Sequence, residues 1–203
     1  MKQVDKEHYR FSRYCYPDRW ASYYHQLEEL LRYNPDTVLE VGAGDEVVKN
    51  YLETNTSVKH TSLDIAEDLH PDIIGSIDKI PLGDSTFDIV CAFEVLEHIP
   101  FESFEKAILE MKRVAKDYVL MSVPHFGPAL KLNFKIPFLP EIRVACKIPF
   151  PKEHVFNGQH YWELGKKEYP LSRVKSILKN HFVLIKDFVP YDNQYHHFFI
   201  LKK

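Results

Sequence analysis

The stretch VLEVGAGD, residues 38–45, sets the expectation for the whole chain. Its apolar residues surround one acid, Glu40, in a pattern typical of a buried strand, and Gly42, Ala43 and Gly44 follow directly. Glycine is needed where a backbone takes positive φ or comes so close to a ligand that a Cβ would collide with it. The stretch therefore predicts a strand that ends in a glycine turn beneath a nucleotide-like ligand.

The spacing of the glycines argues against a dinucleotide. The dinucleotide fingerprint has a third glycine three residues after the second, and this chain has Val47 there. Instead, Glu40 stands two residues before the first glycine, and a second acid, Asp64, ends the next apolar run. An acid at that second strand end is placed to accept hydrogen bonds from ribose hydroxyls.

Three motifs occur in a characteristic order: EVGAG at residues 40–44, Asp64, and FDIV at 87–90 leading into EVLEHI at 94–99. Together they resemble the class I S-adenosylmethionine-dependent methyltransferases, over roughly residues 36–124. Within that family the chain is similar to the small-molecule branch that includes ubiquinone-biosynthesis (type 11) enzymes. The resemblance implies S-adenosylmethionine as cofactor. It also implies an α/β, Rossmann-like fold with a mostly parallel seven-stranded sheet, helices on both faces and an antiparallel last strand.

The resemblance also implies where the cofactor binds. The glycine turn would hold the methionine end, Asp64 the ribose and Ile65 the adenine face, while the residues after the fourth strand would touch the sulfonium. The predicted cofactor-binding residues are Glu40, Gly42, Ala43, Gly44, Asp64, Ile65, Ser76, Ile77 and Glu94.

Two positions depart from the family pattern. Many members have a further glycine near position 46, where this chain has Glu46. The family's adenine-binding acid falls on Ser76, which leaves two interpretations open: the Ser76 hydroxyl binds the adenine amino group, or Asp78 reaches in from two residues on.

The 203 residues are most simply one domain, because a chain of this length buries about 70% of its unfolded surface around a single core. We expect an N-terminal helical cap at 1–35, a cofactor-binding core at 36–123, a substrate lid at 124–170, and a C-terminal helix and hairpin at 171–203. Within the cap, a helix begins at Pro17 and ends before Pro35.

The lid is an insertion after the fifth strand, which we expect to stop at Pro124. Residues 125–169 combine prolines, aromatics and basic residues without clear periodicity or a clean amphipathic stripe, and such a long irregular segment is usually functional. Arg143 and the lysines either bind a phosphate or carboxylate of the acceptor or solvate the lid. A basic, aromatic lid is also compatible with contact to an anionic membrane surface that carries a lipid-linked acceptor.

Transfer to a hydroxyl or an acidic carbon is helped by a general base with a pKa near the operating pH, which favours histidine. His125 follows the fifth strand and His160 lies in the lid, so these are the candidate catalytic residues. A structural role is the competing interpretation for each. The candidate substrate-binding residues are Tyr9, Arg19, His154 and Tyr161. We expect no metal site, because His154 and His160 lack an acid or thiol partner at ligand spacing.

Composition limits the possible partners. The formal charge of −3 and the absence of an Asn-Pro-Pro-Tyr or Asp-Pro-Pro-Tyr motif after the fourth strand oppose nucleic-acid binding. The cysteines are odd in number and far apart, which suits a reducing cytoplasm. No apolar run reaches the 18 or so residues of a spanning helix, so we expect no stable membrane insertion.

The sequence therefore predicts a cytoplasmic methyltransferase with a small-molecule acceptor, such as a sugar, a lipid-linked saccharide or a quinone-like compound. Two alternatives stay open. One is a non-catalytic protein of this fold that binds S-adenosylmethionine, which the departures at Glu46 and Ser76 allow. The other is a nucleic-acid methyltransferase.

Overall fold

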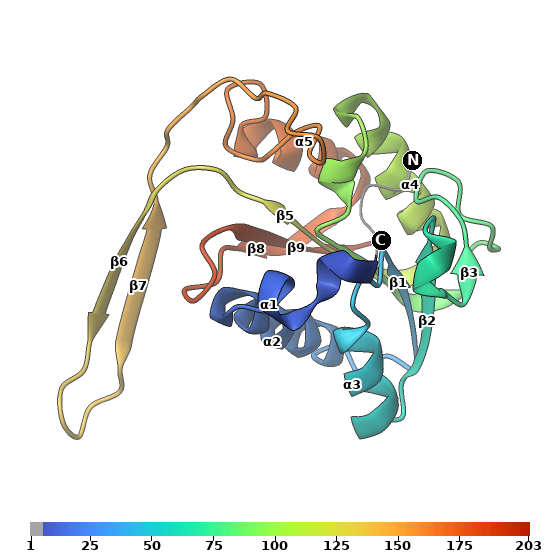
Figure 1. Cartoon of the computed structure of the whole chain (residues 1–203), viewed down its shortest axis with the longest axis horizontal. Helices are drawn as coiled ribbons and strands as arrows, with labels where there is room; N and C mark the ends of the chain where they lie inside the picture. The colour runs from blue at the N-terminus through green and yellow to red at the C-terminus, as the bar shows by residue number, and fades with distance from the viewer. Residues whose placement is uncertain (1–5) are drawn as a thin grey trace.

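A seven-stranded sheet lies at the centre of the structure, a computed structural model that describes residues 6–203 (Figure 1). The strands follow one another in the order β3, β2, β1, β4, β5, β9, β8. Their bounds in that order are Ile73–Ile74, Lys59–Asp64, Thr37–Val41, Phe87–Phe93, Ala115–Pro124, His196–Lys202 and Val183–Phe188. The pairs from β3 to β5 are parallel, whereas β9 is antiparallel to both β5 and β8. The predicted fold class is confirmed.

Helices cover both faces of this sheet (Figure 1). The helices are α1 (Phe11–Tyr14), α2 (Pro17–Leu31), α3 (Val47–Asn55), α4 (Phe104–Val114) and α5 (Leu171–His181). Helix α2 begins at Pro17 as predicted, and residues 1–5 of the predicted cap lie outside the described part of the chain. Among residues 6–203, no helix is both long enough and apolar enough to cross a membrane.

Alternating side chains of β1 divide the core into two layers. Leu39 belongs to the layer that contains Phe104 of α4, whereas Val38 belongs to the layer that contains Leu30 of α2 and Leu52 of α3. All five side chains are fully buried. This is the pattern of a parallel sheet covered on both faces, as the apolar runs predicted.

The strand order determines where a ligand-binding crevice can form. The chain runs from β1 outward to β3 and then returns to form β4 on the other side of β1. The connections after β1 and β4 therefore leave the sheet in opposite directions, which opens a crevice at the carboxyl ends of these two strands.

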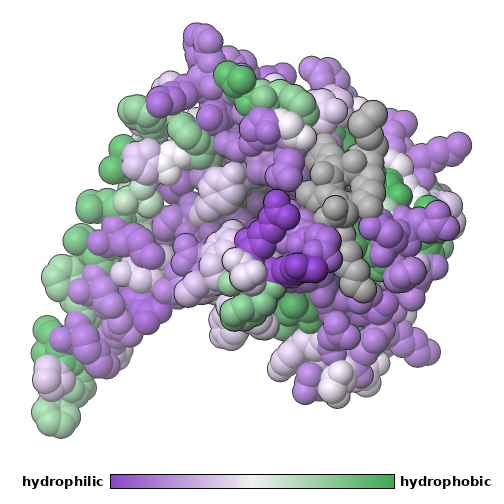
Figure 2. All heavy atoms as spheres, viewed as in Figure 1, coloured by the Kyte–Doolittle hydropathy of each residue, from purple (hydrophilic) through white to green (hydrophobic). Residues whose placement is uncertain are grey.

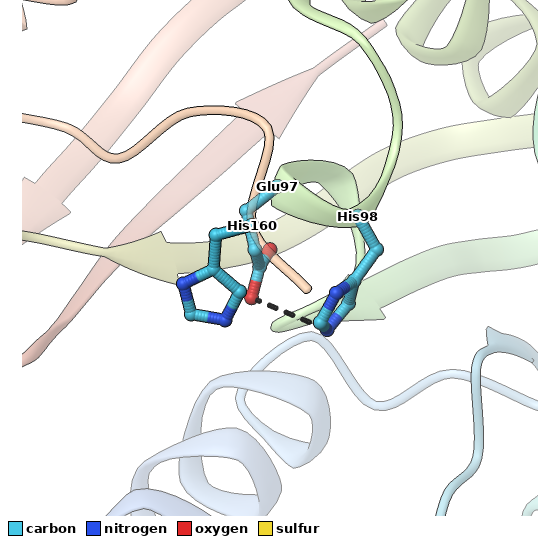
Figure 3. Close-up of side chains that lie close together, drawn as sticks. All are labelled: Glu97, His98 and His160. Atoms are coloured by element: carbon cyan, nitrogen blue, oxygen red, sulfur yellow. Dashed lines mark ion pairs between the residues drawn. The ribbon is translucent and has the colours of Figure 1, made fainter. Parts of the chain in front are cut away.

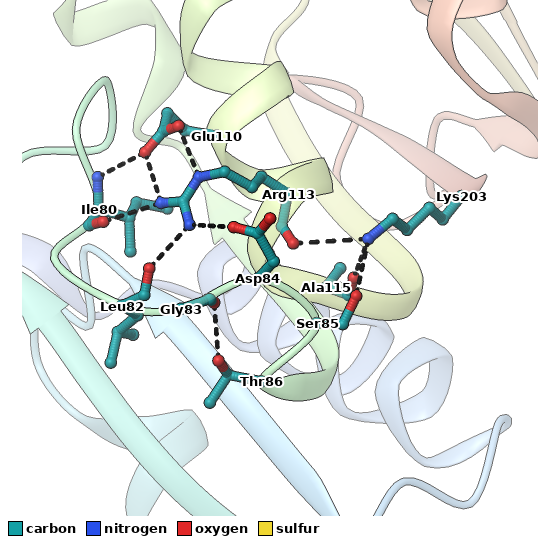
Figure 4. Close-up of polar contacts among 10 residues, drawn as sticks. All are labelled: Ile80, Leu82, Gly83, Asp84, Ser85, Thr86, Glu110, Arg113, Ala115 and Lys203. Carbon is teal, nitrogen blue, oxygen red and sulfur yellow. Dashed lines mark hydrogen bonds and ion pairs between the residues drawn. The ribbon is translucent and has the colours of Figure 1, made fainter.

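A dense polar network holds the loop between β3 and β4 against α4 (Figure 4). Arg113 donates to the carbonyls of Ile80 and Leu82 and to Asp84, and Glu110 accepts from the Ile80 amide. Arg113 and Glu110 also form an ion pair of 2.8 Å. These bonds fix the carboxyl-terminal part of a loop whose beginning, Gly75 to Ile77, lines the site described below.

Residues 125–169 differ from the prediction in their first part. Pro124 does not stop β5 but is its last residue. Beyond it, β6 (Ala129–Phe134) and β7 (Ile142–Lys147) form an antiparallel hairpin that projects as an arm from the body (Figure 1). The prediction of no amphipathic stripe was wrong, because the cross-strand register aligns apolar pairs on one face of the arm. These pairs are Leu130 with Cys146, Leu132 with Val144 and Phe134 with Ile142.

The apolar pattern of the arm is visible on the molecular surface. Figure 2 shows hydrophobic atoms along the outer side of the arm and at its tip, where Phe138 is fully exposed. Arg143 points the other way and pairs with Glu141 and Asp192. The stripe was missed because prolines at 128, 137 and 140 suggested irregular backbone.

The second part of the predicted lid returns to the body and packs into its core. Trp162 and Leu164 are fully buried, and the Trp162 indole stands edge-on to the rings of Phe101 and Phe104. The Trp162 Nε1–H donates to the Leu96 carbonyl at 3.0 Å. The segment 153–170 is therefore a fixed wall of the site, while the arm extends into solvent.

Trp162→Ala tests this wall. We expect a loss of about 3–5 kcal/mol in the free energy of unfolding, because the change leaves a large cavity and removes the indole hydrogen bond to the Leu96 carbonyl. Chemical denaturation followed by circular dichroism measures it. The matched control is Trp20→Ala, whose side chain is half exposed and which should cost no more than about 1 kcal/mol. Equal losses in the two variants would contradict the assignment.

Candidate active site

Two cavities meet at the carboxyl ends of β1 and β4. The larger has a volume of about 440 Å³ and is bordered by the ends of β1, β2 and β4 and by the loop after β3. The smaller has a volume of about 130 Å³ and lies between the glycine turn, the N-terminal helices and the segment around His160. Both are lined by Tyr9, Gly42, Glu94 and His98. A ligand long enough to pass these residues would occupy both cavities.

The glycine turn separates β1 from α3 and forms the floor between the cavities. Gly42 has a φ of 76°, and a Cβ there would overlap Val95 Cγ2 in the turn after β4. Gly44 has a φ of 55°, and its Cβ would lie 3.3 Å from the Tyr9 ring. Glu46 also takes a positive φ, of 60°, which explains why glycine suits this position in the family that the sequence resembles. The positive φ predicted for the glycine turn is confirmed at Gly42 and Gly44, whereas the close approach at Gly42 is to Val95.

The larger cavity contains the predicted acid at the end of β2. Asp64 lines it together with Ile65, and Asp64 Oδ1 accepts from the Ala66 amide at 2.8 Å. Burial raises the pKa of the Asp64 carboxyl, while the Ala66 and Ile65 amides act in the opposite direction. The carboxyl is thus held by its own turn and faces a space that can accept hydroxyl donors.

The two candidates for binding the adenine, Ser76 and Asp78, are hydrogen-bonded to each other. Ser76 and Ile77 line the larger cavity, whereas Asp78 does not appear in its lining. The Ser76 hydroxyl donates to Asp78 Oδ1 at 2.5 Å, and Lys106 contacts the other Asp78 oxygen at 3.0 Å. Both interactions lower the pKa of Asp78, the Ser76 bond most. Ser76 therefore borders the cavity, with Asp78 behind it as a charged hydrogen-bond acceptor.

Arg19 brings a positive charge to the smaller cavity. Its guanidinium lies 4.4 Å from the centre of the Tyr14 ring. The Arg19 Nε is buried and has no hydrogen-bond partner within residues 6–203. A buried N–H without an acceptor costs free energy, so this group is suited to an anionic ligand group.

Three carboxyls surround the same cavity: Glu40 and Glu97 are buried, and the Glu94 side chain is 10% exposed. Burial is the main cause that raises the pKa of each, to about 7 for Glu94 and well above the ordinary value for Glu97. Glu94 accepts from the Ser122 hydroxyl at 2.8 Å and has a φ of 56°, a strained value that turns its side chain after β4. Glu40 Oε2 lies 2.8 Å from His60 Nε2.

The two candidate catalytic histidines lie in different places. His160 lines the smaller cavity, and its Nδ1 donates to Glu163 at 2.9 Å. His125 lines neither cavity; its Nδ1 lies 2.9 Å from His197 Nδ1, and burial lowers its pKa to about 3. His125 is therefore a partly buried histidine outside both cavities, and its catalytic role stays an untested prediction.

Two of the four candidate substrate-binding residues line a cavity, and two do not. Tyr9 lines both cavities and Arg19 the smaller one, whereas His154 and Tyr161 line neither. The His154 Nε2–H donates to the His160 carbonyl, and the Tyr161 amide donates to the Glu97 carbonyl. All predicted cofactor-binding residues, in contrast, line one or both cavities.

Sequence reasoning missed several residues of the smaller cavity. Glu97 and His98 lie in the EVLEHI motif after β4, whose residues were expected to touch the sulfonium, but neither was among the candidate site residues. Tyr14, Gln159 and Tyr195 belong to no such motif and reach the cavity from segments distant in sequence. Only the folded chain brings these segments together.

Comparisons with known proteins agree with this geometry. Residues 39–121 match the family model of the methyltransferase domain, and a search of curated proteins returns no match. Among solved structures, the chain is similar to the 1,6-didemethyltoxoflavin-N1-methyltransferase of Burkholderia thailandensis with bound 1,6-didemethyltoxoflavin and S-adenosylhomocysteine. That match has 15% identity, covers 92% of this chain and 81% of that one, and has a TM-score of 0.61.

Two further structures have the same fold. Magnesium protoporphyrin IX methyltransferase from Synechocystis PCC 6803 with bound S-adenosylmethionine matches with 13% identity over 92% of this chain and 80% of that one, at a TM-score of 0.60. A S-adenosylmethionine-dependent methyltransferase from Aquifex aeolicus matches with 17% identity over 98% of both chains, at a TM-score of 0.59. The chain therefore has the class I methyltransferase fold, and residues 39–121 match the methyltransferase-domain model within it.

Asp64→Ala tests the larger cavity. A carboxylate that accepts hydrogen bonds from hydroxyls contributes about 1.5–3 kcal/mol per bond, so we expect S-adenosylhomocysteine to bind about 10- to 150-fold more weakly. Isothermal titration calorimetry measures the difference. The control is Glu67→Ala, an exposed acid nearby that lines neither cavity and should leave the affinity unchanged. An unchanged affinity in Asp64→Ala would mean that the ribose lies elsewhere.

Proposed function

We propose that this chain, whose residues 39–121 form a methyltransferase domain within a class I fold, transfers a methyl group from S-adenosylmethionine to a small-molecule acceptor. One observation carries the proposal: a cavity with the residues for an adenosyl group adjoins a second, polar cavity through Gly42 and Glu94. The adenosyl part of the donor would bind in the first cavity, and its methionine end would reach the glycine turn and Arg19 in the second, from which the acceptor would approach.

The residues fit the cofactor on physical grounds. Asp64 is suited to the ribose hydroxyls, and Ser76 with the Ile77 amide to the adenine edge. Gly42 takes a positive φ of 76° and lines both cavities, so its backbone can border the bound molecule. The unpartnered Arg19 Nε suits the carboxylate of the cofactor. Arg19 would thus bind the methyl donor, whereas the sequence indicated that it binds the substrate.

The bound cofactor supplies an electrophilic methyl group on a sulfonium, which is a good leaving group. The protein's contribution is then to align the acceptor, to exclude water and to accept a proton where the acceptor has one. Alignment of two reactants contributes up to about 7–11 kcal/mol. The aromatic wall of Tyr9, Tyr14 and Tyr195 at the smaller cavity suits the first two tasks.

We propose Glu94 as the general base. It lines both cavities, and its pKa, raised by burial to about 7, lies close to physiological pH. A general base works best when its pKa is near the operating pH. His160 lines the same cavity, but its Nδ1 is bonded to Glu163. His125 lines neither cavity.

The smaller cavity is too small to enclose a whole ligand of ordinary size, so only one end of the acceptor molecule would enter it. A volume of about 130 Å³ is below that of a typical ligand pocket, about 300–1,000 Å³. It would hold a single ring or a hydroxyl-bearing end of a sugar, lipid-linked saccharide or quinone-like molecule. A base within duplex nucleic acid would have to be flipped out of its stack to enter, and no basic surface motif in the sequence favours such a substrate.

The proposal predicts a defined pH dependence. Because Glu94 must lose its proton to act as a base, methyl transfer should rise with pH through a midpoint of about 7. Glu94→Gln should lower the rate by about 10²- to 10⁴-fold and abolish that inflection. The measurement is transfer of a labelled methyl group to a metabolite extract, with mass spectrometry to identify the product.

Two outcomes would count against it. Saturable binding of S-adenosylmethionine without any methylated product would favour the non-catalytic alternative. A product with an unchanged pH profile in Glu94→Gln would remove Glu94 from the role of base. Ser85→Ala, a change in a loop remote from both cavities, provides the control for expression and handling.

A further inference from the structure

Three side chains with metal-binding atoms converge at the smaller cavity (Figure 3). Glu97, His98 and His160 each offer one ligand atom, and these atoms all lie within 4.8 Å of one another. Glu97 and His98 belong to the turn after β4, whereas His160 comes from the segment that returns after the arm. The sequence predicted no metal site because only the spacing of His154 and His160 was considered. Glu97 and His98, more than 60 positions before His160, were not included.

The backbone holds the two contributing segments together. The Tyr161 amide donates to the Glu97 carbonyl at 2.8 Å, directly beside His160. The Trp162 indole donates to the Leu96 carbonyl at 3.0 Å. The relative position of the three side chains is therefore fixed by the fold and does not depend on a flexible loop.

Both imidazoles are oriented as metal ligands usually are. The His98 Nδ1–H donates to the Gln159 carbonyl at 3.1 Å, and the His160 Nδ1–H donates to Glu163 at 2.9 Å. A metal-binding histidine commonly donates its other ring N–H to a carbonyl or carboxylate, which sets the tautomer and raises ligand basicity. This arrangement leaves the Nε2 atom of each imidazole as the one that would bind a metal ion.

The carboxyl of Glu97 gives independent support. Its side chain is 1% exposed, and Oε2 is buried without a hydrogen-bond partner in the described chain. The other oxygen, Oε1, lies 3.9 Å from His98 Nε2. A buried carboxylate oxygen without a partner is costly unless a cation coordinates it.

We infer that Glu97, His98 and His160 bind one divalent cation of the borderline class, such as Zn²⁺, Mn²⁺, Fe²⁺ or Co²⁺. Two imidazoles and a carboxylate suit these ions better than Mg²⁺ or Ca²⁺, which prefer oxygen ligands, or soft ions, which prefer thiolates. Zinc binds such ligands at about 2.1 Å, which separates them by roughly 3.4 Å in a tetrahedron. The three ligand atoms would draw together by about 1 Å on binding.

The ion would have open coordination positions toward the smaller cavity, since all three ligands line it. An oxygen of the acceptor, such as a hydroxyl or phenol oxygen, is the ligand that this site would bind next. This assignment of an oxygen acceptor rests on the proposed function. Binding of the ion itself does not, and it is measurable without a methyl donor.

Cobalt provides the direct test, because Co²⁺ bound to nitrogen and oxygen ligands absorbs visible light. The wild-type protein, treated with a chelator and dialysed, should take up one Co²⁺ per chain on titration with Co²⁺ alone. His160→Ala and Glu97→Gln should each weaken this binding by at least about 100-fold. Glu163→Gln removes a charge behind His160 and should weaken it by about 10- to 100-fold, as outer partners of metal ligands do.

The control is His181→Ala, a histidine on α5 that pairs with Glu105 outside the cluster and should bind Co²⁺ as the wild type does. Circular dichroism and melting temperature establish that each variant is folded. Absence of Co²⁺ uptake by the wild type, or equal affinity in the wild type, His160→Ala and Glu97→Gln, would overturn the site. S-adenosylhomocysteine binding with no Co²⁺ uptake would overturn only the metal inference, and Co²⁺ uptake with no S-adenosylhomocysteine binding would count against the proposed function alone.

Discussion

The contact between Gly42 and Val95 is the constraint on which the rest of the site depends. It brings the turn after β1 against the turn after β4, so closely that no Cβ fits between them. Strand pairing fixes the same approach from below, since Val41 lies opposite Ala92 in adjacent parallel strands. Because the two turns touch, the neighbours of the contact, Gly44 in the first turn and Glu94 in the second, border the same cavity.

The carboxyl groups around that cavity make the folding stability of the protein depend on pH. Burial raises the pKa of Glu94 from its ordinary 4.5 to about 7, so the folded protein binds more protons than the unfolded chain between these pH values. Stability should therefore fall as the pH rises through this window, and Glu94 contributes no such penalty below it. Natural proteins retain costly buried carboxyls mainly where they have a function, which agrees with the location of Glu40, Glu94 and Glu97 around one space.

The residues of the larger cavity were largely predictable from the sequence, and many of those of the smaller cavity were not. The residues at the ends of β1, β2 and β4 occupy fixed positions in their motifs, so Gly42, Asp64 and Glu94 could be identified from order and spacing. Tyr195 reaches the cavity from beside β9, and Gln159 from beyond the arm. Nothing local in the sequence records such long-range contacts. The register of the arm was missed for a different reason, because its prolines flank the strands and obscured their alternation.

The returning segment 153–170 has to close a long loop before the smaller cavity forms. More than 60 residues separate Glu97 from His160, and the entropic cost of closure grows slowly with that length. Burial of Trp162 and its bond to the Leu96 carbonyl offset this cost at one point. The same closure sets His160 beside Glu97 and His98, and the Tyr161 amide on the Glu97 carbonyl. Packing of one indole and the arrangement of the smaller cavity therefore depend on the same loop closure.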